Sequence, residues 1–199
     1  MPVPTEIRTA RLTLRPWHPD DAPRLAPILE TNWNHLGPWI PRRIAEPAAV
    51  PVLAERLSGF ASNFASDLDW RYAMLSADER TVLGEVALFP RAETGRVPYA
   101  DADRAEIGYW LRSDMTGQGF VSEAVRAVLD VASSLSKVSR VEIRCDARNA
   151  ASAAVPRRLG FELSDRVTSS GVSVESARGS PVILLQCQGL PSPTQSSAN

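Results

Sequence analysis

The stretch RAEIGYWLRSDMTGQGFVSEAVRAVLDVA, from Arg104 to Ala132, does most to decide the fold of this chain. Its first part, Glu106 to Leu111, is typical of a short β-strand, and Met115 to Phe120 forms a glycine-containing turn. The remainder has the strongest helical period in the chain, with one apolar face formed by Val121, Ala124, Val125, Val128, Leu129 and Ala132. The sequence therefore predicts a strand, a tight turn and an amphipathic helix in direct succession.

Periodic apolar residues predict the other elements of the fold. Apolar runs predict strands at residues 11–15, 71–75, 82–89, 138–145 and 182–187. Apolar residues spaced by three and four predict a helix capped by Asp20 and Asp21, a second over Leu53 to Phe64, and a third over Asn149 to Leu159, which Gly160 ends. Residues 31–51 are rich in Pro, Trp and Asn without a clear period, so they predict a loop with at most a short helix.

This order of elements predicts an α/β fold in which layers of helices pack on a mixed sheet. A chain of 199 residues can bury one substantial core, and we expect residues 1–189 to form a single domain. Residues 190–199 are rich in Ser, Pro and Gln, and we expect them to form a disordered tail. Pro156 lies inside the last predicted helix, where we expect a kink.

The composition narrows the class of protein. Apolar residues make up 44% and charged residues 23% of the chain, as in a typical globular domain. A formal net charge of −1 with scattered arginines gives no basic patch for nucleic acid. No apolar run is long enough to span a membrane, and the first residues lack the pattern of a signal peptide, so we expect a cytoplasmic protein.

The cysteines and histidines suggest neither a disulfide framework nor a metal site. Cys145 and Cys187 each lie in an apolar run and are expected to be buried thiols, and the histidines are His18 and His35. This set is too small for a zinc site, so we expect no metal. Nothing near Cys145 in the sequence would lower the pKa of its thiol, which disfavours a mechanism through an acylated cysteine.

The turn Gly117-Gln118-Gly119 lies between a strand and a helix. Two glycines allow the backbone to approach a ligand closely, and the N-terminus of the following helix presents free N–H groups to an anion such as phosphate. A tight turn without a ligand explains the same residues. The motif lacks the GK[ST] sequence of an NTP-binding loop.

A second polar motif, Asn149-Ala-Ala-Ser152, opens the helix that ends at Gly160. Asn149 suits the N-cap position, and Ser152 can turn back toward the same helix end. Helix capping alone explains both residues. The functional alternative is that these polar groups also face a cofactor between the two neighbouring strands.

Glu106 opens the strand that leads into the glycine turn. A carboxylate there can accept a proton from a substrate amine, directly or through a water, because an amine must be neutral to attack. A surface ion pair with Arg104 is the simpler explanation. Strand alternation places Glu106, Gly108 and Trp110 on one face, so Glu106 and Trp110 are expected to face the same space.

Three motifs follow one another in this chain: Arg104-Ala-Glu-Ile-Gly-Tyr-Trp-Leu111, Gly117-Gln-Gly119 and Asn149-x-x-Ser152-x-x-Val155-Pro156-x-x-Leu-Gly-Phe161. Together they resemble the GNAT superfamily of acetyltransferases, and within it the branch that contains the ribosomal-protein N-terminal alanine and serine acetyltransferases. The resemblance covers roughly residues 82–161. It implies a mixed, mostly antiparallel central sheet with helices on both faces and a splayed pair of central strands.

The resemblance also implies a cofactor site for acetyl-CoA. Its pantetheine arm would bind like a short strand in the splay, and its pyrophosphate would bind main-chain N–H groups of the glycine turn. Asn149 would hold the pantetheine, Ser152 would lie near the sulfur as a catalytic residue beside Glu106, and an N–H group near Gly108 would polarise the thioester carbonyl. The implied cofactor-binding residues are Tyr109, Trp110, Leu111, Thr116, Gly117, Gln118, Gly119, Phe120, Val121, Asn149 and Ser152.

Two residues depart from the family pattern. Thr116 stands where Arg or Gln is usual, and Val121 stands where Gly or Ala is usual. The first change removes a long polar side chain, and the second adds bulk beside the expected phosphates. Weaker cofactor binding would follow from either.

The expected acceptor pocket consists of Trp33, Trp39, Glu106 and Trp110, because amphipathic rings can wall a site while polar groups orient a ligand. Packing in the core explains Trp110 equally well. The acidic loop residues Asp101 and Asp103 would help a cationic acceptor. The resemblance implies direct acetyl transfer to a primary amine, such as a peptide N-terminus. A small-molecule amine, or a catalytically silent acyl-CoA-binding module, remain alternatives. Dimers among similar proteins make a homodimer a further expectation.

Overall fold

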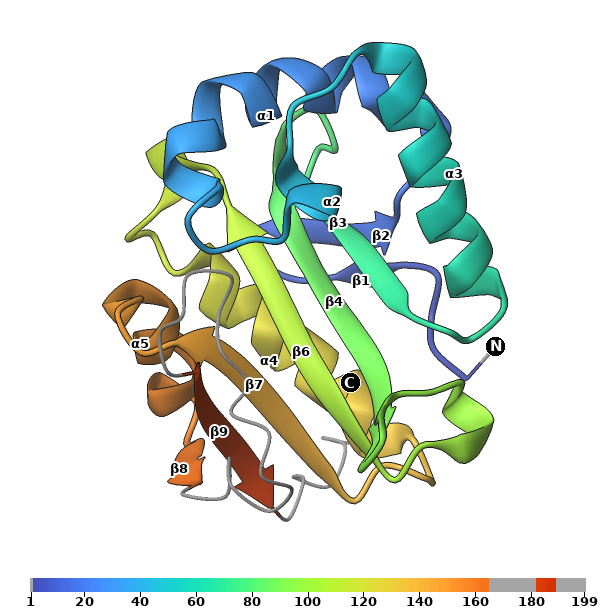
Figure 1. The fold of residues 1–199 in the computed structure, drawn as a ribbon, viewed down its shortest axis with the longest axis vertical. Helices are drawn as coiled ribbons and strands as arrows, with labels where there is room; N and C mark the ends of the chain where they lie inside the picture. The colour runs from blue at the N-terminus through green and yellow to red at the C-terminus, as the bar shows by residue number, and fades with distance from the viewer. Residues whose placement is uncertain (1, 165–181, 189–199) are drawn as a thin grey trace, which may run out of the picture.

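The computed structural model describes residues 2–164 and 182–188, and within them the strands form one sheet (Figure 1). Its spatial order is β1-β2-β3-β4-β6-β7-β9-β8, and β5 pairs with β4. The strands are β1 (Ile7–Arg8), β2 (Leu12–Pro16), β3 (Trp70–Ser76), β4 (Val82–Ala92), β5 (Gly95–Arg96), β6 (Arg104–Leu111), β7 (Arg140–Asp146), β8 (Glu162–Ser164) and β9 (Val182–Gln188).

The sheet is antiparallel except at its centre, where β6 and β7 run parallel. Their pairing covers only three positions, from Ala105 with Val141 to Ile107 with Ile143. Both strands continue past this point, to Leu111 and Asp146 respectively, without pairing with each other. The expected splay of the central strands is therefore confirmed, and we call the opening beyond Ile107 and Ile143 the seam.

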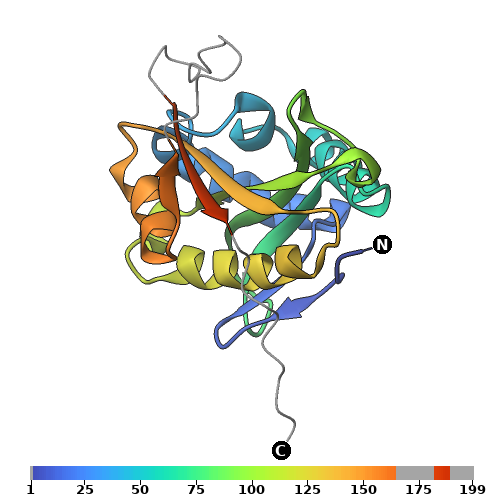
Figure 2. The same ribbon diagram turned by 90° about the horizontal axis from the view of Figure 1, so that it is seen from below.

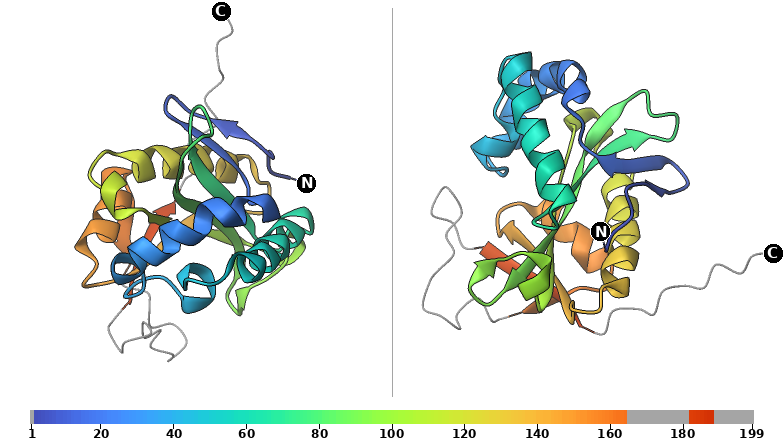
Figure 3. Two further views of the ribbon diagram at one scale, coloured as in Figure 1. Left: turned by 90° about the horizontal axis from the view of Figure 1, so that it is seen from above. Right: turned by 90° about the vertical axis from the view of Figure 1, so that its right-hand side faces the viewer.

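Helices cover both faces of the sheet (Figures 2 and 3). One face carries α4 (Phe120–Ser134) and α5 (Ala150–Arg158), and the other carries α1 (Ala22–Leu36), α2 (Arg42–Ala45) and α3 (Val50–Ala65). Single turns of 3-10 helix occur at Pro19–Asp21, Tyr99–Asp101 and Ser113–Met115. Within the described residues, no helix is both long and apolar enough to cross a membrane.

Strand alternation supplies each helical layer with its own apolar core. In β4 and β6, Val86, Leu88 and Ile107 pack on the side of α4. Trp110 instead joins the core formed with α1 and α3. Figure 1 shows that α1, α2 and α3 lie over one end of their face, and that none of the described helices covers the opposite end of β4, β6 and β7 on that face.

The predicted order of strands and longer helices is confirmed, but one boundary is wrong. The helix α1 continues to Leu36, whereas we expected a loop from Thr31. Its last two turns are stabilised by burial of Leu36 and of Asn32, whose side-chain amide donates to the carbonyl oxygen of Ile28. The sequence pattern also missed the short strands β1, β5 and β8. Residues 190–199 and the side chain of Cys187 lie outside the described parts.

Candidate active site

The glycine turn before α4 adopts the geometry expected of an anion site. Gly117 and Gly119 have φ values of 76° and 82°, and Gly119 occupies the N-cap position of α4 without a side-chain cap. In the described part of the chain, the N–H groups of residues 117–122 have no protein acceptor. The helix dipole adds positive potential at the same place. These main-chain groups suit the pyrophosphate of acetyl-CoA.

Two details refine the expectation for this turn. The N–H group of Thr116 is used within the protein, because it donates to the carbonyl oxygen of Ser113 over 3.3 Å, as does the Thr116 hydroxyl over 2.8 Å. Thr116 therefore does not share in the set of free N–H groups. Val121 is half-buried and packs against the apolar core, so its bulk is directed inward.

Arg11 braces the glycine turn from the start of β2, a role that the sequence did not reveal. Its guanidinium donates to the carbonyl oxygen of Gln118 (2.9 Å) and to the carboxylate of Glu123 (2.7 Å), and it lies 4.4 Å from the centre of the Phe120 ring. The hydroxyl of Thr9 also donates to Glu123 (2.6 Å). Residues more than a hundred positions apart thus fix the backbone that would meet the phosphates.

The seam contains a cluster of three polar side chains from β6, β7 and α5. The phenol of Tyr109 donates to the main-chain carbonyl oxygen of Ser152 (2.8 Å), and the Ser152 hydroxyl contacts the Tyr109 phenol oxygen (3.2 Å). Burial raises the pKa of Tyr109, which keeps the phenol protonated. Burial also raises the pKa of Cys145, a free thiol, so this sulfur is a poor nucleophile.

Asn149 caps α5 as the sequence predicts. Its side-chain oxygen accepts the N–H of Ser152 (3.0 Å), so the simpler explanation of this motif, helix capping, is correct. The capping bond leaves the side-chain NH₂ of Asn149 available, because no described residue accepts from it. Gly160 has a φ of 81°, as expected of a residue that ends a helix. The motif therefore orients Ser152 toward Tyr109 and the seam.

Glu106 lies on the face opposite α4, and its ion pairs differ from our expectation. Its Oε2 atom lies 3.1 Å from Arg91 Nη1 and 3.4 Å from Arg144 Nε. The expected partner, Arg104, instead pairs with Asp103 (2.7 Å) and with Glu142 (3.7 Å). The sequence alone could not choose among these arginines, because only the strand pairing brings Arg91 and Arg144 to Glu106.

The aromatic residues expected in the acceptor pocket occupy different environments. Trp39 is 39% exposed, and Trp33 is half-buried with the guanidinium of Arg42 about 6.0 Å from its ring centre. Trp110 is buried in the core with α1 and α3, and its indole N–H has no partner in the described residues. The side chain of Trp110 faces away from α4, so only its main chain can reach a ligand in the seam, as for a strand-like cofactor contact.

Asn32 and Asp103 are structural in this fold. The side-chain oxygen of Asn32 accepts both the N–H and the hydroxyl of Ser113 (2.8 Å each), which ties α1 to the loop after β6. Asp103 is held by Arg104 and does not stand free to attract a cationic acceptor. Over residues 2–164 and 182–188, no three His, Cys, Asp or Glu side chains are placed to share a metal ion.

A buried network of charges lies next to Trp110, on the face of the sheet that carries α1 and α3. Glu85 accepts the indole N–H of Trp17 (2.7 Å) and pairs with Arg71 (2.8 Å). The guanidinium of Arg71 is stacked between Phe60 and Phe89, 4.6 and 4.8 Å from their ring centres. Burial raises the pKa of Glu85 against the opposing effect of Arg71. This network ties β3 and β4 to Trp17 and to Phe60 of α3.

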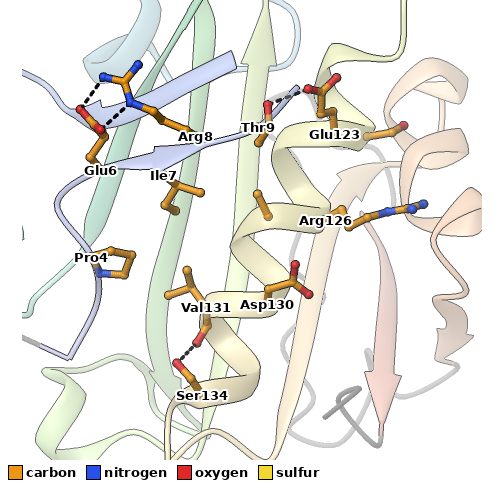
Figure 4. A pocket seen from close by; sticks show the side chains of 12 residues that line it. Pro4, Glu6, Ile7, Arg8, Thr9, Glu123, Arg126, Asp130, Val131 and Ser134 are labelled. Atoms are coloured by element: carbon orange, nitrogen blue, oxygen red, sulfur yellow. Dashed lines mark hydrogen bonds and ion pairs between the residues drawn. The ribbon is translucent and has the colours of Figure 1, made fainter. Parts of the chain in front are cut away.

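A separate groove of about 870 Å³ lies between the N-terminal segment and α4, shown in Figure 4. Its walls carry the ion pair of Arg8 with Glu6 and the bond from Thr9 to Glu123. Neither Glu106 nor the residues of the seam line it. This groove is therefore separate from the seam and from Glu106.

Comparison with known proteins identifies the class. Residues 11–162 match the family described as acetyltransferase (GNAT) domain. The chain is 31% identical over 153 residues to YdaF of Bacillus subtilis (strain 168), which carries the provisional name of ribosomal N-acetyltransferase; the match covers 75% of this chain and 77% of that protein. This chain therefore belongs to the GNAT family and is an acetyl-CoA-dependent N-acetyltransferase.

Solved structures show the same fold at lower identity. The RimL ribosomal L7/L12 α-N-protein acetyltransferase, solved with coenzyme A, matches with a TM-score of 0.73 at 20% identity, over 94% of this chain and 97% of that one. The microcin C7 self-immunity acetyltransferase MccE, solved with acetyl-CoA and AMP, matches with a TM-score of 0.75 at 18% identity over the same shares. At these identities the likeness concerns the fold.

Proposed function

We propose that this enzyme acetylates the α-amino group of a protein or peptide N-terminus by direct attack on acetyl-CoA in a ternary complex. The observation that carries the proposal is the seam, which has Tyr109 and Ser152 at one side, while Glu106 lies on the opposite face of β6. An opening between two strands suits an extended chain. The name of the B. subtilis relative supports the same class of acceptor.

The residues present fit acetyl-CoA. Main-chain groups of β6 beyond Ile107 lack partners on β7, which leaves a free edge for the amide groups of the pantetheine arm. The uncapped N-terminus of α4 would hold the pyrophosphate, and the free NH₂ of Asn149 would donate to the arm. When bound, acetyl-CoA supplies the activated acetyl group. We expect the protein to act in the cytoplasm, where this co-substrate is made and used.

In the proposed reaction the amine nitrogen forms a bond to the acetyl carbon while the carbon–sulfur bond breaks. The proton that leaves nitrogen passes to Glu106 or to a water that Glu106 orients, and the departing sulfur takes a proton from the Tyr109–Ser152 pair. A main-chain N–H near Gly108 would stabilise the negative charge on oxygen. The ion pairs with Arg91 and Arg144 leave Oε2 of Glu106 without a hydrogen-bond donor among the described residues, so the role that we favour for Glu106 is to orient a water.

The test combines calorimetric titration with acetyl-CoA and a free-thiol assay on peptide N-termini and small amines. Binding with thiol release that depends on a peptide would support the proposal, whereas thiol release with small amines alone would favour a small-molecule acceptor. Glu106→Gln should lower turnover and leave acetyl-CoA affinity intact, and Glu30→Gln, an exposed helical carboxylate, is the matched control. Unchanged turnover of Glu106→Gln at every pH would remove Glu106 from the mechanism.

A catalytically silent acyl-CoA-binding module remains the second candidate, because Thr116 and Val121 depart from the family pattern. The inward packing of Val121 weakens this alternative. Acetyl-CoA binding without turnover on any amine would favour it.

A further inference from the structure

Three arginines form a line across neighbouring strands of the sheet, at the end of β4 and the start of β6. Arg91 of β4 lies opposite Arg96 of β5 on one side and opposite Arg104 of β6 on the other. Residues directly opposite in antiparallel pairs point to the same face, so the three guanidinium groups share the face that carries Glu106. Like charges in such positions oppose folding unless anions compensate them. We call these residues the arginine row.

The acids of the protein compensate this row only in part. Asp103 holds Arg104 (2.7 Å) and Glu106 holds Arg91 (3.1 Å). Arg96 has no ion pair in the described part of the chain; its guanidinium lies 3.7 Å from the centre of the Phe89 ring. The Nε atom of Arg91 is buried and has no hydrogen-bond acceptor among the described residues. The exposed guanidinium of Arg96, at the end of the row, therefore has donors for one more anionic group.

Arg96 combines accessibility with electrostatic contact to the site. Arg96 is exposed to solvent. Burial of part of its side chain lowers its pKa, and the negative charge of Glu106 offsets part of this effect. Arg96 thus belongs to the same charged cluster as Glu106 but forms no ion pair with any residue that the structure describes. A guanidinium in this state, stacked on a ring and half in solvent, suits recognition of a carboxylate.

The distance along β6 indicates where on an acceptor the anion would be. Arg104 is four residues before Gly108, which corresponds to about 13 Å of strand. The Arg91 side chain extends along the sheet toward Gly108, because its Nη1 atom lies 3.1 Å from Glu106 Oε2. An extended peptide with its α-amine near Gly108 would therefore bring the side chain of its second to fourth residue to the row. A small amine would be too short to span this distance.

We propose that the enzyme selects acceptor peptides that carry an acidic side chain at the second, third or fourth residue, bound by Arg91 and Arg96. This inference rests on the proposed function, because it specifies the acceptor of the same site. It also reverses the expectation of a cationic acceptor, since Asp103 is neutralised by Arg104.

The test measures peptide affinity separately from chemistry. Protein saturated with CoA, which cannot transfer acetyl, is titrated calorimetrically with Ser-initiated peptides that carry Glu or Gln at positions two to five. We expect the best Glu peptide to bind about tenfold more tightly than its Gln partner, with the preference absent at position five. Arg96→Gln should reduce this ratio to near one. Arg126→Gln, an exposed arginine on the far side in α4, should leave it unchanged.

The outcomes separate this inference from the proposed function. Equal affinity for Glu and Gln peptides, or a ratio that Arg96→Gln does not change, would overturn the role of the arginine row even if peptides are acetylated. Selective binding of Glu peptides without turnover in the thiol assay would uphold the row and contradict the proposed reaction. A charge reversal, Arg96→Glu, should shift the preference toward Lys at the same position, which a mere loss of folding could not produce.

Discussion

The phenol oxygen of Tyr109 and the hydroxyl oxygen of Ser152 lie 3.2 Å apart, and the phenol also donates to the Ser152 carbonyl oxygen. This contact joins β6 to the first turn of α5 across the seam. Because burial raises the pKa of Tyr109, the phenol stays protonated over the pH range in which amines are acetylated. In the reaction that we propose, this pair would supply the proton that the departing sulfur takes.

Replacing Tyr109 with Phe tests this role. Loss of a buried hydrogen bond should lower the free energy of unfolding by about 1 kcal/mol, and loss of the proton donor should lower kcat by roughly 100-fold. Single-turnover measurements on Tyr109→Phe, Ser152→Ala and the double variant would show non-additive losses, because the two groups act as one unit. If Tyr109→Phe had the kcat of the wild type, the phenol would contribute to stability and not to catalysis.

The glycine turn provides a matched pair of substitutions. At Gly119 the φ of 82° strains any L-residue, so Gly119→Ala should cost about 1–2 kcal/mol of stability and weaken acetyl-CoA binding. Gly59 lies inside α3, where an added Cβ would meet no heavy atom within 4 Å, so Gly59→Ala should stabilise the protein by about 0.5–1 kcal/mol. Thermal melts with and without acetyl-CoA measure both effects, and a gain of stability in Gly119→Ala would refute the assignment of strain.

Arg11 should influence cofactor affinity without touching the reacting atoms. In Arg11→Gln the bonds to Gln118 and Glu123 are lost, and we expect the Kd for acetyl-CoA to rise about fivefold while kcat at saturation is retained. Calorimetry and steady-state kinetics separate the two quantities. Arg8→Gln serves as the control, since Arg8 forms exposed ion pairs on β1 away from the turn. Equal affinity of Arg11→Gln and wild type would mean that the turn holds its shape unaided.

Asp21 should make folding stability sensitive to acid. Burial raises the pKa of Asp21, but hydrogen bonds from Arg15 and the His18 N–H outweigh this effect and hold the pKa below its usual value. A lowered folded-state pKa stabilises the protein above the unfolded value near 4, and this contribution is lost as pH falls through the folded value. Asp21→Asn should therefore cost about 1–3 kcal/mol at pH 7, and urea unfolding near pH 2 should show little difference from wild type. If the unfolding free energies of Asp21→Asn and wild type differed by the same amount at both pH values, the stabilisation would not depend on ionisation of Asp21.

The sequence predicted the elements whose apolar residues repeat clearly. The helix from Val121 and the strand from Glu106 have unbroken periods, and the structure confirms both. The end of α1 was missed because Asn32, Trp33 and Asn34 mask its period between Thr31 and Leu36. The strands β1 and β5 contain two residues each, which is too short for any repeat to be seen.

The candidate site was predicted where a motif is local and missed where residues meet through the sheet. Asn149 and Ser152 lie three positions apart on one helix end, so their contact follows from capping rules. Arg11 meets Gln118, and Arg91 meets Glu106, only because β2, β4 and β6 adopt a particular order. No pattern in a single sequence gives that order, and so none could have supplied these partners.

The three pairs of residues that join β6 to β7 have a mechanical consequence. On one side of the seam lie the strands that carry Glu106 and the arginine row, and on the other lie β7, β8 and β9, with α5 connecting β7 to β8. A ligand that hydrogen-bonds to both strands beyond Ile107 would connect the two halves of the sheet. Binding of acetyl-CoA should therefore make the protein more rigid, and release of CoA should make it more flexible. The rigidity of the central sheet would then rise and fall once in each catalytic cycle.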